Sequence, residues 1–491
     1  MHVAPRTPVL VGIGTATQRE EDPDAALEPA GLMVRALEAA AADAGAAPLL
    51  ASADAIAVPR GFWEYSDPGR LVADAVGATR ARSVLAEIGV LQTSLFAKAC
   101  STIQRGEADV YLVTGGETKY RASRAQKLGR EATLTRQKDA APDEVLRPAD
   151  DILHPLEMRR ELVMPVRQYA VMESALRFEE KRSVADHQRH VAELWAGFNR
   201  VAASNPEAWS PEPVDVDELV AGSERNRMLA FPYTKLHNSQ WNVDQAAGLL
   251  FCSTERAEQA GIPVSRWVFP RAVAESNYML TLVERRDLHR SPGFAAAGAR
   301  ALSDAGLAVS DLDLLELYSC FPLAVEHQAR EIGIALDRPL SVTGGMAFAG
   351  GPLNNFVLQA VARMGRLLRD GEGRNGMVNA VSGMITKQGV SLWSREPGAG
   401  PFVAADVSRE SQDATARVEV ASGVAGAAKV AGYTVLFGPA APDQLIALCD
   451  LPDGRRSIAY SRDAEWMARA QREELCGQNV RLAADETMHP A

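Results

Sequence analysis

The stretch AEIGVLQTSLFAKACSTIQRGEADVYLVTGG, from Ala86 to Gly116, decides the fold. Its apolar residues recur at every fourth position, which predicts one buried face of a helix. These residues are Leu91, Leu95, Ala99 and Ile103. Gly106 ends the helix, and the apolar run 110–114 has no alternation, which predicts a strand covered on both faces. Such a strand needs helices above and below its sheet.

A second copy of this unit, PLNNFVLQAVARMGRLLRDGEGRNGMVNAVSG, runs from Pro352 to Gly383. The turn before each helix matches, with Gly89 corresponding to Gly351. An upstream helix–strand pair is doubled as well, in 32–58 and 294–317. Internal duplication of this kind predicts an α/β protein with two halves that share one order of elements.

Composition narrows the class of protein. The 491 residues are too many for one core, and the formal net charge of −11 argues against a nucleic-acid partner. The five cysteines show no paired spacing, which fits a reducing cytosol and neither a disulfide framework nor a zinc site. The sequence shows no signal-peptide layout and no apolar run long enough to span a bilayer. We expect a cytoplasmic protein without a membrane span.

The chain divides into five predicted segments. They are an N-terminal half (1–118), an inserted loop domain (119–240), the return of the N-terminal half (241–266), a C-terminal half (267–395) and a small β-rich domain (402–491). Short strands split by Gly, Pro and Asp make a five-strand barrel the expected form of the last segment. We expect the final residues, 484–491, to be frayed.

A basic segment, 119–138, opens the loop domain and contains a single acid, Glu131. Its cations are Lys119, Arg121, Arg124, Lys127, Arg130, Arg136 and Lys138. One interpretation is a seat for an anionic ligand such as the phosphates of a nucleotide-like cofactor, with Arg121, Arg124 and Lys127 as the binding residues. The other is a solvated loop.

Two further groups of polar residues lie in the loop domain. The segment 230–253 is dense in polar and aromatic residues, and its His237, Asn238 and Gln240 either form a pocket wall or close the insertion as a hydrogen-bonded loop. His187 and His190 lie three apart on a predicted helix, but no third ligand accompanies them. We therefore expect no metal and two solvent-facing histidines.

Six blocks in order carry a family resemblance. They are GEADVYLVTGGE (106–117), NRMLAFPYTKLHN (226–238), NVDQAAGLLFCS (242–253), DLLELYSCFP (313–322), GGMAFAGGPLNN (344–355) and SGMITKQGVSLWS (382–394). The chain resembles the thiolase superfamily, closest to the actinobacterial thiolase-like protein type 1 group and to the thiolases of the sterol-carrier-protein type. The resemblance implies a layered αβαβα fold and, for the type 1 group, an extra C-terminal domain.

The resemblance also implies that the thiolase catalytic residues are missing. Gly89 stands where a thiolase has its nucleophilic cysteine, Gly351 where it has the activating histidine, and Gly383 where it has the second cysteine. Tyr318 replaces the Asn or His of the fourth block. Cys100 cannot substitute, because it lies three turns into the helix on its buried side. The glycines either widen the cavity or leave it filled by neighbours such as Met346, Met384 or Tyr318.

Three hypotheses follow. The first is a protein of lipid or sterol metabolism that binds CoA or acyl-CoA weakly, without thiolase (acetyl-CoA acetyltransferase) activity. The second is an acyl-CoA carbon–carbon bond enzyme, a retro-aldol lyase or acyltransferase, with Tyr318 as acid/base, and Cys320 beside it as a reactive thiol or a small buried residue. The third is a non-enzymatic interaction module whose C-terminal domain docks a protein partner. The resemblance also implies a monomer, as in the type 1 group. Thiolases usually dimerise through the strand that leads into the nucleophile turn, here 83–88, and Glu87 is a poor interface residue within it.

Overall fold

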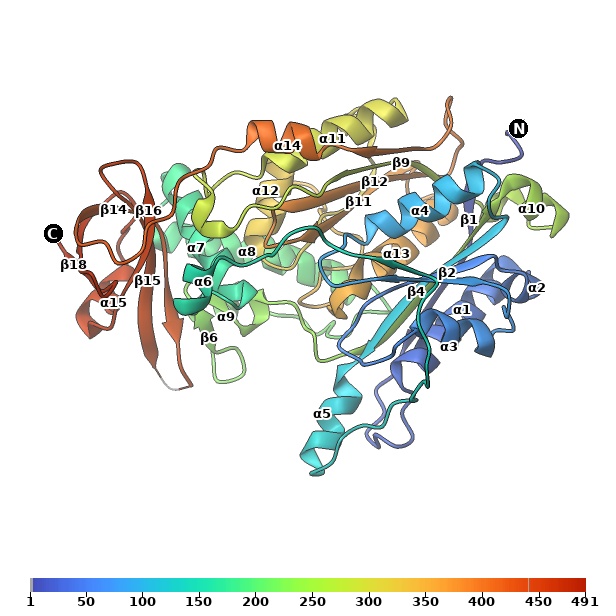
Figure 1. Cartoon of the computed structure of the whole chain (residues 1–491), viewed down its shortest axis with the longest axis horizontal. Coiled ribbons are helices and arrows are strands. Elements are labelled where there is room, and N and C mark those ends of the chain that lie inside the picture. Colours follow the sequence, from blue (N-terminus) through green and yellow to red (C-terminus); the bar gives the residue numbers. More distant parts are fainter. Residues whose placement is uncertain (1–2, 440) are drawn as a thin grey trace.

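The computed structural model describes residues 3–439 and 441–491. Two α/β halves stack on each other, and a β-rich domain lies at one end of the molecule (Figure 1). The first sheet has the order β1-β8-β4-β2-β3-β5 and the second β10-β11-β12-β9-β13. The strands of the first sheet are β1 (Pro8–Thr17), β2 (Ala55–Pro59), β3 (Arg82–Ala86), β4 (Val110–Thr118), β5 (Glu144–Leu146) and β8 (Asp244–Ser253). Those of the second are β9 (Phe269–Ser276), β10 (Leu314–Glu316), β11 (Asn375–Ser382), β12 (Lys387–Ser394) and β13 (Val403–Asp406).

The predicted duplication is confirmed by the strand order. The series β1-β8-β4-β2 of the first sheet repeats in the second as β9-β12-β11-β10. In each half the middle strand pairs antiparallel with the next strand of that half, β4 with β8 and β11 with β12. In each half it also pairs parallel with the strand on its other side, β4 with β2 and β11 with β10.

Helices form the remaining layers (Figure 1). The helices of the first half are α1 (Pro29–Ala44), α2 (Pro48–Ala51), α3 (Pro68–Ala75), α4 (Thr93–Gln104) and α10 (Thr254–Gln259). Those of the second are α11 (Pro292–Ala305), α12 (Pro322–Ile332), α13 (Phe356–Asp370) and α14 (Ser408–Ala414). The helices α4 and α13 pack between the two sheets, and the predicted face of α4 is fully buried in the core that they share. With α1 and α3 outside the first sheet and α11 and α12 outside the second, the order of layers is αβαβα.

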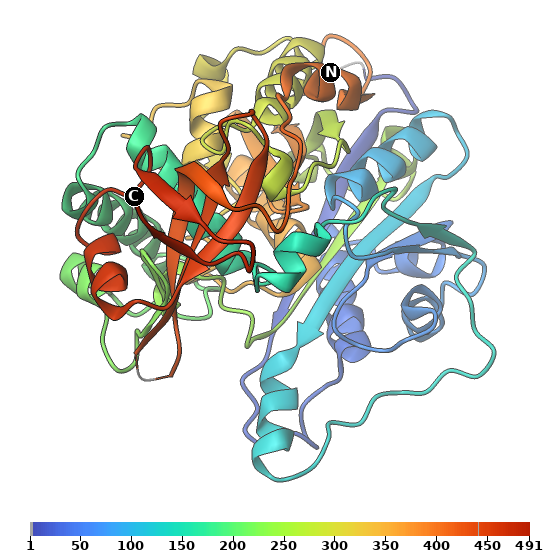
Figure 2. The same ribbon diagram turned by 60° about the vertical axis from the view of Figure 1, so that its left-hand side comes forward.

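The loop domain follows β4. Its elements are α5 (Lys119–Lys127), α6 (Pro155–Arg159), α7 (Pro165–Glu179), α8 (Val184–Ala203), α9 (Val216–Ala221), β6 (Met228–Ala230) and β7 (Tyr233–Thr234). The helix α5 projects away from the body of the molecule in both views (Figures 1 and 2). The strand β5 returns to the first sheet and pairs in parallel with β3, from Val84 opposite Glu144 to Ala86 opposite Leu146. The chain therefore covers the edge of β3 with its own backbone.

The C-terminal domain is a sheet in the order β16-β15-β14-β17-β18. Its elements are β14 (Gly426–Phe437), β15 (Pro442–Asp450), β16 (Arg456–Ser461), α15 (Ala464–Ala470), β17 (Asn479–Leu482) and β18 (Met488–Pro490). A bridge between Tyr460 and Thr487 joins the two ends of this order, as in a barrel. The expectation of a frayed end is wrong, because β18 pairs with β17 and Met488 is buried.

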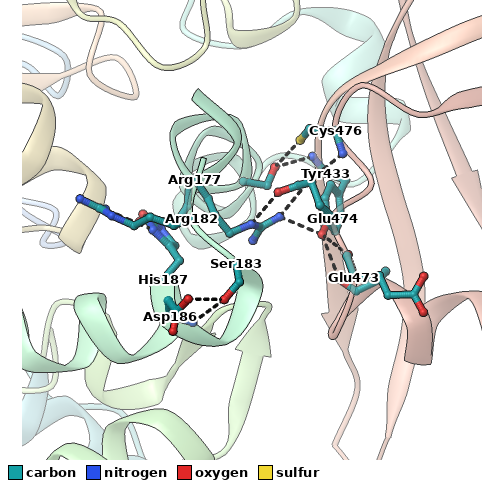
Figure 3. Close-up of polar contacts among 12 residues, drawn as sticks. Arg177, Arg182, Ser183, Asp186, His187, Tyr433, Glu473, Glu474 and Cys476 are labelled. Atoms are coloured by element: carbon teal, nitrogen blue, oxygen red, sulfur yellow. Dashed lines mark hydrogen bonds and ion pairs between the residues drawn. The ribbon is translucent and has the colours of Figure 1, made fainter. Parts of the chain in front are cut away.

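The C-terminal domain packs on α7 of the loop domain (Figures 2 and 3). Buried Arg177 of α7 donates to the Glu474 carboxylate, with Nε–Oε2 and Nη2–Oε1 distances of 2.8 and 3.1 Å. It also donates to the Tyr433 hydroxyl at 2.8 Å, and the Tyr433 backbone N–H donates to Ser174 Oγ at 2.8 Å. One face of this domain is therefore covered by the insertion. Within the described residues, every helix is too short or too polar to cross a membrane.

Candidate functional site

Contacts of neighbouring residues link the segments that contain the four positions marked as catalytic by the family resemblance. The side chain of Lys387, at the foot of the 383–386 turn, donates from Nζ to the Gly89 carbonyl at 2.8 Å. Gln92 donates to Asn354, which follows Gly351, at 3.1 Å. The Tyr318 ring meets Phe356 edge-on, with centroids 6.0 Å apart. The fold thus brings segments from both halves to one place.

Gly89 lies in the turn before α4 with φ of +101°, a conformation that favours glycine. A Cβ added there would lie 3.0 Å from Cγ of Pro148, in the loop after β5. The space beside the expected nucleophile position is therefore occupied by the insertion.

Gly351 is enclosed by the loop that contains Gln240. Its N–H donates to the Gln240 carbonyl at 2.8 Å, and the Gln240 N–H donates to the Met346 carbonyl at 2.9 Å. A Cβ at Gly351 would lie 3.0 Å from Cβ of Ser239 and 3.5 Å from Cβ of Met346. The sequence-based interpretation named Met346 as one filler of this space, and the structure adds Ser239.

The turn after β11 places three successive residues in the left-handed region. Gly383, Met384 and Ile385 have φ of +60°, +55° and +66°, which is rare for a β-branched side chain such as that of Ile385. A Cβ at Gly383 would lie only 2.5 Å from Sδ of Met279. Buried Arg285 donates from Nη2 to the Gly383 carbonyl at 3.3 Å, and burial lowers its pKa to about 10.

Tyr318 and Cys320 both line the boundary between the halves. Tyr318 is partly buried, and burial raises its pKa well above the usual 10. Burial also raises the pKa of Cys320 to about 12, although a hydrogen bond with Tyr169 opposes the shift. Neither side chain is a ready anion at neutral pH, so Tyr318 would act first as a hydrogen-bond donor.

The basic segment is partly engaged within the protein. Arg121 is buried and donates to the Pro23 carbonyl at 2.9 Å and to the Thr133 carbonyl at 2.8 Å. Arg124 forms an ion pair with Glu21. Lys127 is exposed and has no carboxylate within 4.0 Å in the described ranges. Of the three predicted binding cations, Lys127 is the one left open to a ligand.

Of the two interpretations of His237, Asn238 and Gln240, the contacts favour the hydrogen-bonded loop over the pocket wall for His237 and Asn238. His237 is buried, its Nδ1 accepts from the Thr234 N–H at 3.2 Å, and burial lowers its pKa to about 3. Asn238 donates from Nδ2 to the Thr234 carbonyl at 2.7 Å. His237 therefore lies neutral inside the insertion, whereas Gln240 and its neighbours reach the site around Gly351.

The expectation that His187 and His190 face solvent is wrong for His187, whereas the His190 side chain is partly exposed, at 29%. His187 is buried, and its Nε2 lies 2.6 Å from a Glu173 oxygen, while Nε2 of His190 lies 2.7 Å from Oε1 of Glu326. Glu173, His187 and Glu326 have the spacing of possible metal ligands. Arg182, however, lies 3.4 Å from Nδ1 of His187 and can only donate, so Nε2 carries the proton and donates to Glu173. The geometry is that of a hydrogen-bonded network, and the absence of a metal stays a prediction.

Sequence reasoning did not single out the charged groups beneath the site. Glu275 of β9 is buried and accepts from Ser94 Oγ at 2.8 Å and from Thr93 at the start of α4. Burial raises the pKa of Glu275 to about 7 and lowers that of Lys387, which has a buried amine and no carboxylate within 4.0 Å among the described residues. Lys387 could have been found from the sequence, because it is a charged residue at the start of the buried strand 387–394.

No protein-family model matches the chain. Two curated relatives do. An acetyl-CoA acetyltransferase of Methanothermobacter thermautotrophicus is 29% identical over 201 residues, which are 37% of this chain and 50% of the relative. One of Chromobacterium violaceum is 34% identical over 110 residues, 22% of this chain and 26% of the relative. The chain therefore matches half the length, or less, of these relatives.

Solved structures resemble the molecule more completely. The human mitochondrial 3-ketoacyl-CoA thiolase in complex with CoA has a TM-score of 0.57 at 16% identity, over 80% of this chain and 99% of that one. The Ltp2-ChsH2(DUF35) aldolase has a TM-score of 0.60 at 21% identity, over 80% and 99%. The resemblance stated from the sequence is thus confirmed, and the chain has the thiolase fold. Over the full length of both chains it is similar to a monomeric SCP2-thiolase like protein type 1 from Mycobacterium smegmatis, at 29% identity and a TM-score of 0.83.

Proposed function

We propose that this protein binds CoA or an acyl-CoA in lipid or sterol metabolism and has no thiolase activity. The observation that carries the proposal is the filling of the three glycine positions. Pro148, Met279 and the Ser239–Met346 pair occupy the space that side chains at positions 89, 383 and 351 would need. A thiolase forms an acyl-enzyme on a cysteine thiolate, and glycines at positions 89, 351 and 383 supply neither that thiol nor an imidazole to activate it.

Two observations support the binding of a CoA-type ligand: the fold and the cations of the loop domain. A thiolase-fold relative has been solved with CoA. Exposed Lys127, and Lys119 with its Nζ 5.3 Å from the centre of the Trp241 ring, are cations of the loop domain suited to the phosphates. Arg121 is less suited, because its guanidinium is buried and already bonded to carbonyls. Without a covalent anchor for the acyl chain, binding is expected to be weak.

Thiolysis of acetoacetyl-CoA by free CoA tests the activity half. We expect no turnover above the buffer rate, because removal of the members of a catalytic unit costs on the order of a million-fold. A Cys320→Ala variant controls for the remaining thiol near the site. Turnover by the wild type above the buffer rate would contradict the proposal, and its loss in Cys320→Ala would assign that activity to the Cys320 thiol.

A second candidate is an acyl-CoA carbon–carbon bond enzyme that uses Tyr318. The partly exposed phenol at the boundary of the halves favours it, and so does the likeness to an aldolase of the same fold. With its raised pKa, Tyr318 would donate a proton and not remove one. A Tyr318→Phe variant with unchanged activity on every acyl-CoA cleaved by the wild type would exclude this role.

We also propose a monomer. The edge of β3 is paired with the chain's own β5, and Glu87 beyond it donates its N–H to the Leu146 carbonyl at 3.0 Å. The Glu87 carboxylate forms an ion pair with Arg60 at 3.0 Å. A second copy would have to displace these contacts before its own β3 could pair there. A cytoplasmic location and a protein partner of the C-terminal domain stay predictions of the sequence.

A further inference from the structure

A depression of about 270 Å³ lies where α6 of the loop domain meets β15 and β16 of the C-terminal domain. Its lining is mostly polar and comes from both domains. The lining residues are Arg159, Arg160, Glu161, Gln444, Tyr460 and Arg462. Three arginines therefore line one small space in a chain whose formal net charge is −11.

Two of these guanidiniums are held in place. Arg159 donates from Nη2 to Oε1 of Glu486 at 2.9 Å, and Arg160 donates to the other oxygen of the same carboxylate. The guanidinium carbon of Arg160 also lies 4.9 Å from the centre of the Tyr460 ring. Glu486 itself is buried, so it acts as an internal support for both arginines. A ligand would meet donors whose positions are already fixed.

The charges around the depression do not cancel. Glu486 offsets one of its two arginines, and Glu161 forms an ion pair with Arg167 at 3.0 Å. Arg462 is exposed, and its Nη2 lies 3.5 Å from Oε1 of Gln444, a neutral group. About two positive charges thus remain for an occupant with two negative charges.

We infer that this depression binds a phosphoryl group. Guanidinium forks match the oxygens of phosphate in geometry and in charge. The volume is below the 300–1,000 Å³ range usual for whole small-molecule sites, so the depression would take the phosphoryl group and the first atoms of its carrier. Because two domains supply the donors, the site exists only while the C-terminal domain is packed on the insertion. None of its residues lies at the four positions that the resemblance marks as catalytic.

Calorimetric titration of the full chain with pyrophosphate, at low ionic strength in a phosphate-free buffer, tests the inference. The variants are Arg462→Gln and Arg159→Gln, whose side chains are more exposed than that of Arg160. The matched control is Arg409→Gln, which removes one positive charge from a side chain in α14 that is 85% exposed. We expect each site variant to weaken pyrophosphate binding about ten-fold or more, because a hydrogen bond to a charged group is lost. The control is expected to leave the affinity unchanged.

A parallel titration with CoA and dephospho-CoA identifies the source of the phosphoryl group. If Arg462→Gln weakens CoA and not dephospho-CoA, the group is the ribose phosphate of a CoA-type ligand. If it weakens pyrophosphate and leaves CoA unchanged, the ligand is a separate phosphorylated small molecule. Either result supports the site. Wild-type protein that binds neither pyrophosphate nor CoA, or equal weakening in Arg409→Gln, would overturn it, whereas pyrophosphate binding without CoA binding would count only against the proposed function.

Discussion

Replacement of Arg177 by Met should loosen the C-terminal domain from the insertion. The Arg177 side chain is 1% exposed and lies between Glu474 and the Tyr433 hydroxyl (Figure 3). Its guanidinium carbon is 5.3 Å from the centre of the Tyr433 ring, so the substitution removes an ion pair, a hydrogen bond and a cation–π contact together.

The loss of stability depends on how well the Glu474 carboxylate and the Tyr433 hydroxyl are satisfied without Arg177. Breaking a buried ion pair by removing one partner costs about 3–5 kcal/mol, chiefly because the other charge stays buried. The Glu474 side chain is 26% exposed, so water can solvate its carboxylate and the cost falls to the lower end, about 3 kcal/mol. The Tyr433 hydroxyl keeps the Ala470 carbonyl as an acceptor at 3.0 Å. Glu474→Gln, which keeps the shape and loses the charge, is expected to cost about 1–2 kcal/mol.

Thermal unfolding followed by circular dichroism measures the effect. If the C-terminal domain unfolds by itself, its unfolding entropy is about 0.2 kcal/mol per degree for about 90 residues. A loss of about 3 kcal/mol then lowers Tm by about 15 °C. If the chain unfolds as one unit, the fall is about 3 °C, because the unfolding entropy scales with length. Arg189→Met is the control, since Arg189 is 56% exposed and pairs with Asp217, which is 86% exposed, so its loss should cost under about 0.5 kcal/mol. A Tm for Arg177→Met equal to that of the control, or strictly additive effects of Arg177→Met and Glu474→Gln, would refute this reasoning.

Three further predictions concern the site and the assembly. Gly383→Cys should lower the free energy of unfolding by about 2–5 kcal/mol, because φ is +60° and Met279 occupies the Cβ space, and it should restore no thiolysis; an unchanged urea midpoint would contradict this. The pKa of Glu275, raised by burial to about 7, means that its contribution to stability is present below about pH 4.5 and lost as the pH rises through 7. Glu275→Gln should therefore reduce the fall in urea midpoint between pH 5 and pH 8, and the same fall in both proteins would reject the assignment. Sedimentation should give a mass near 52.7 kDa, since β5 covers the edge of β3, and a mass near twice that value would disprove the monomer.

The periodic parts of the sequence were enough to predict the fold. The four-residue stripe at 91–103 and the apolar run at 110–114 are local patterns, and their repetition after Pro352 gave the duplicated halves that the sheets show. The contacts of β5 with β3 and of β18 with β17 were missed because three-residue strands carry too little pattern to predict.

Long-range contacts explain the remaining misses in the site. The sequence could place glycines at positions 89 and 383, but Pro148 and Met279, which fill the space beside them, come from distant segments. The sequence suggested Arg121 as a ligand-binding cation, but in the fold its guanidinium donates to the Pro23 and Thr133 carbonyls. In the same way His187 has no nearby partner in sequence, and the packing of α7 on α8 supplies Glu173.

Calorimetric titration of the purified protein with CoA, and with acyl-CoAs of increasing chain length, tests the central claim most directly. Saturable binding that weakens in a Lys119→Gln/Lys127→Gln variant and not in Arg409→Gln is the predicted result. It would establish a CoA-type ligand for a thiolase fold whose marked catalytic positions are filled. An absence of heat above dilution at millimolar CoA and acyl-CoA would contradict the claim and leave the fold as a scaffold for another role.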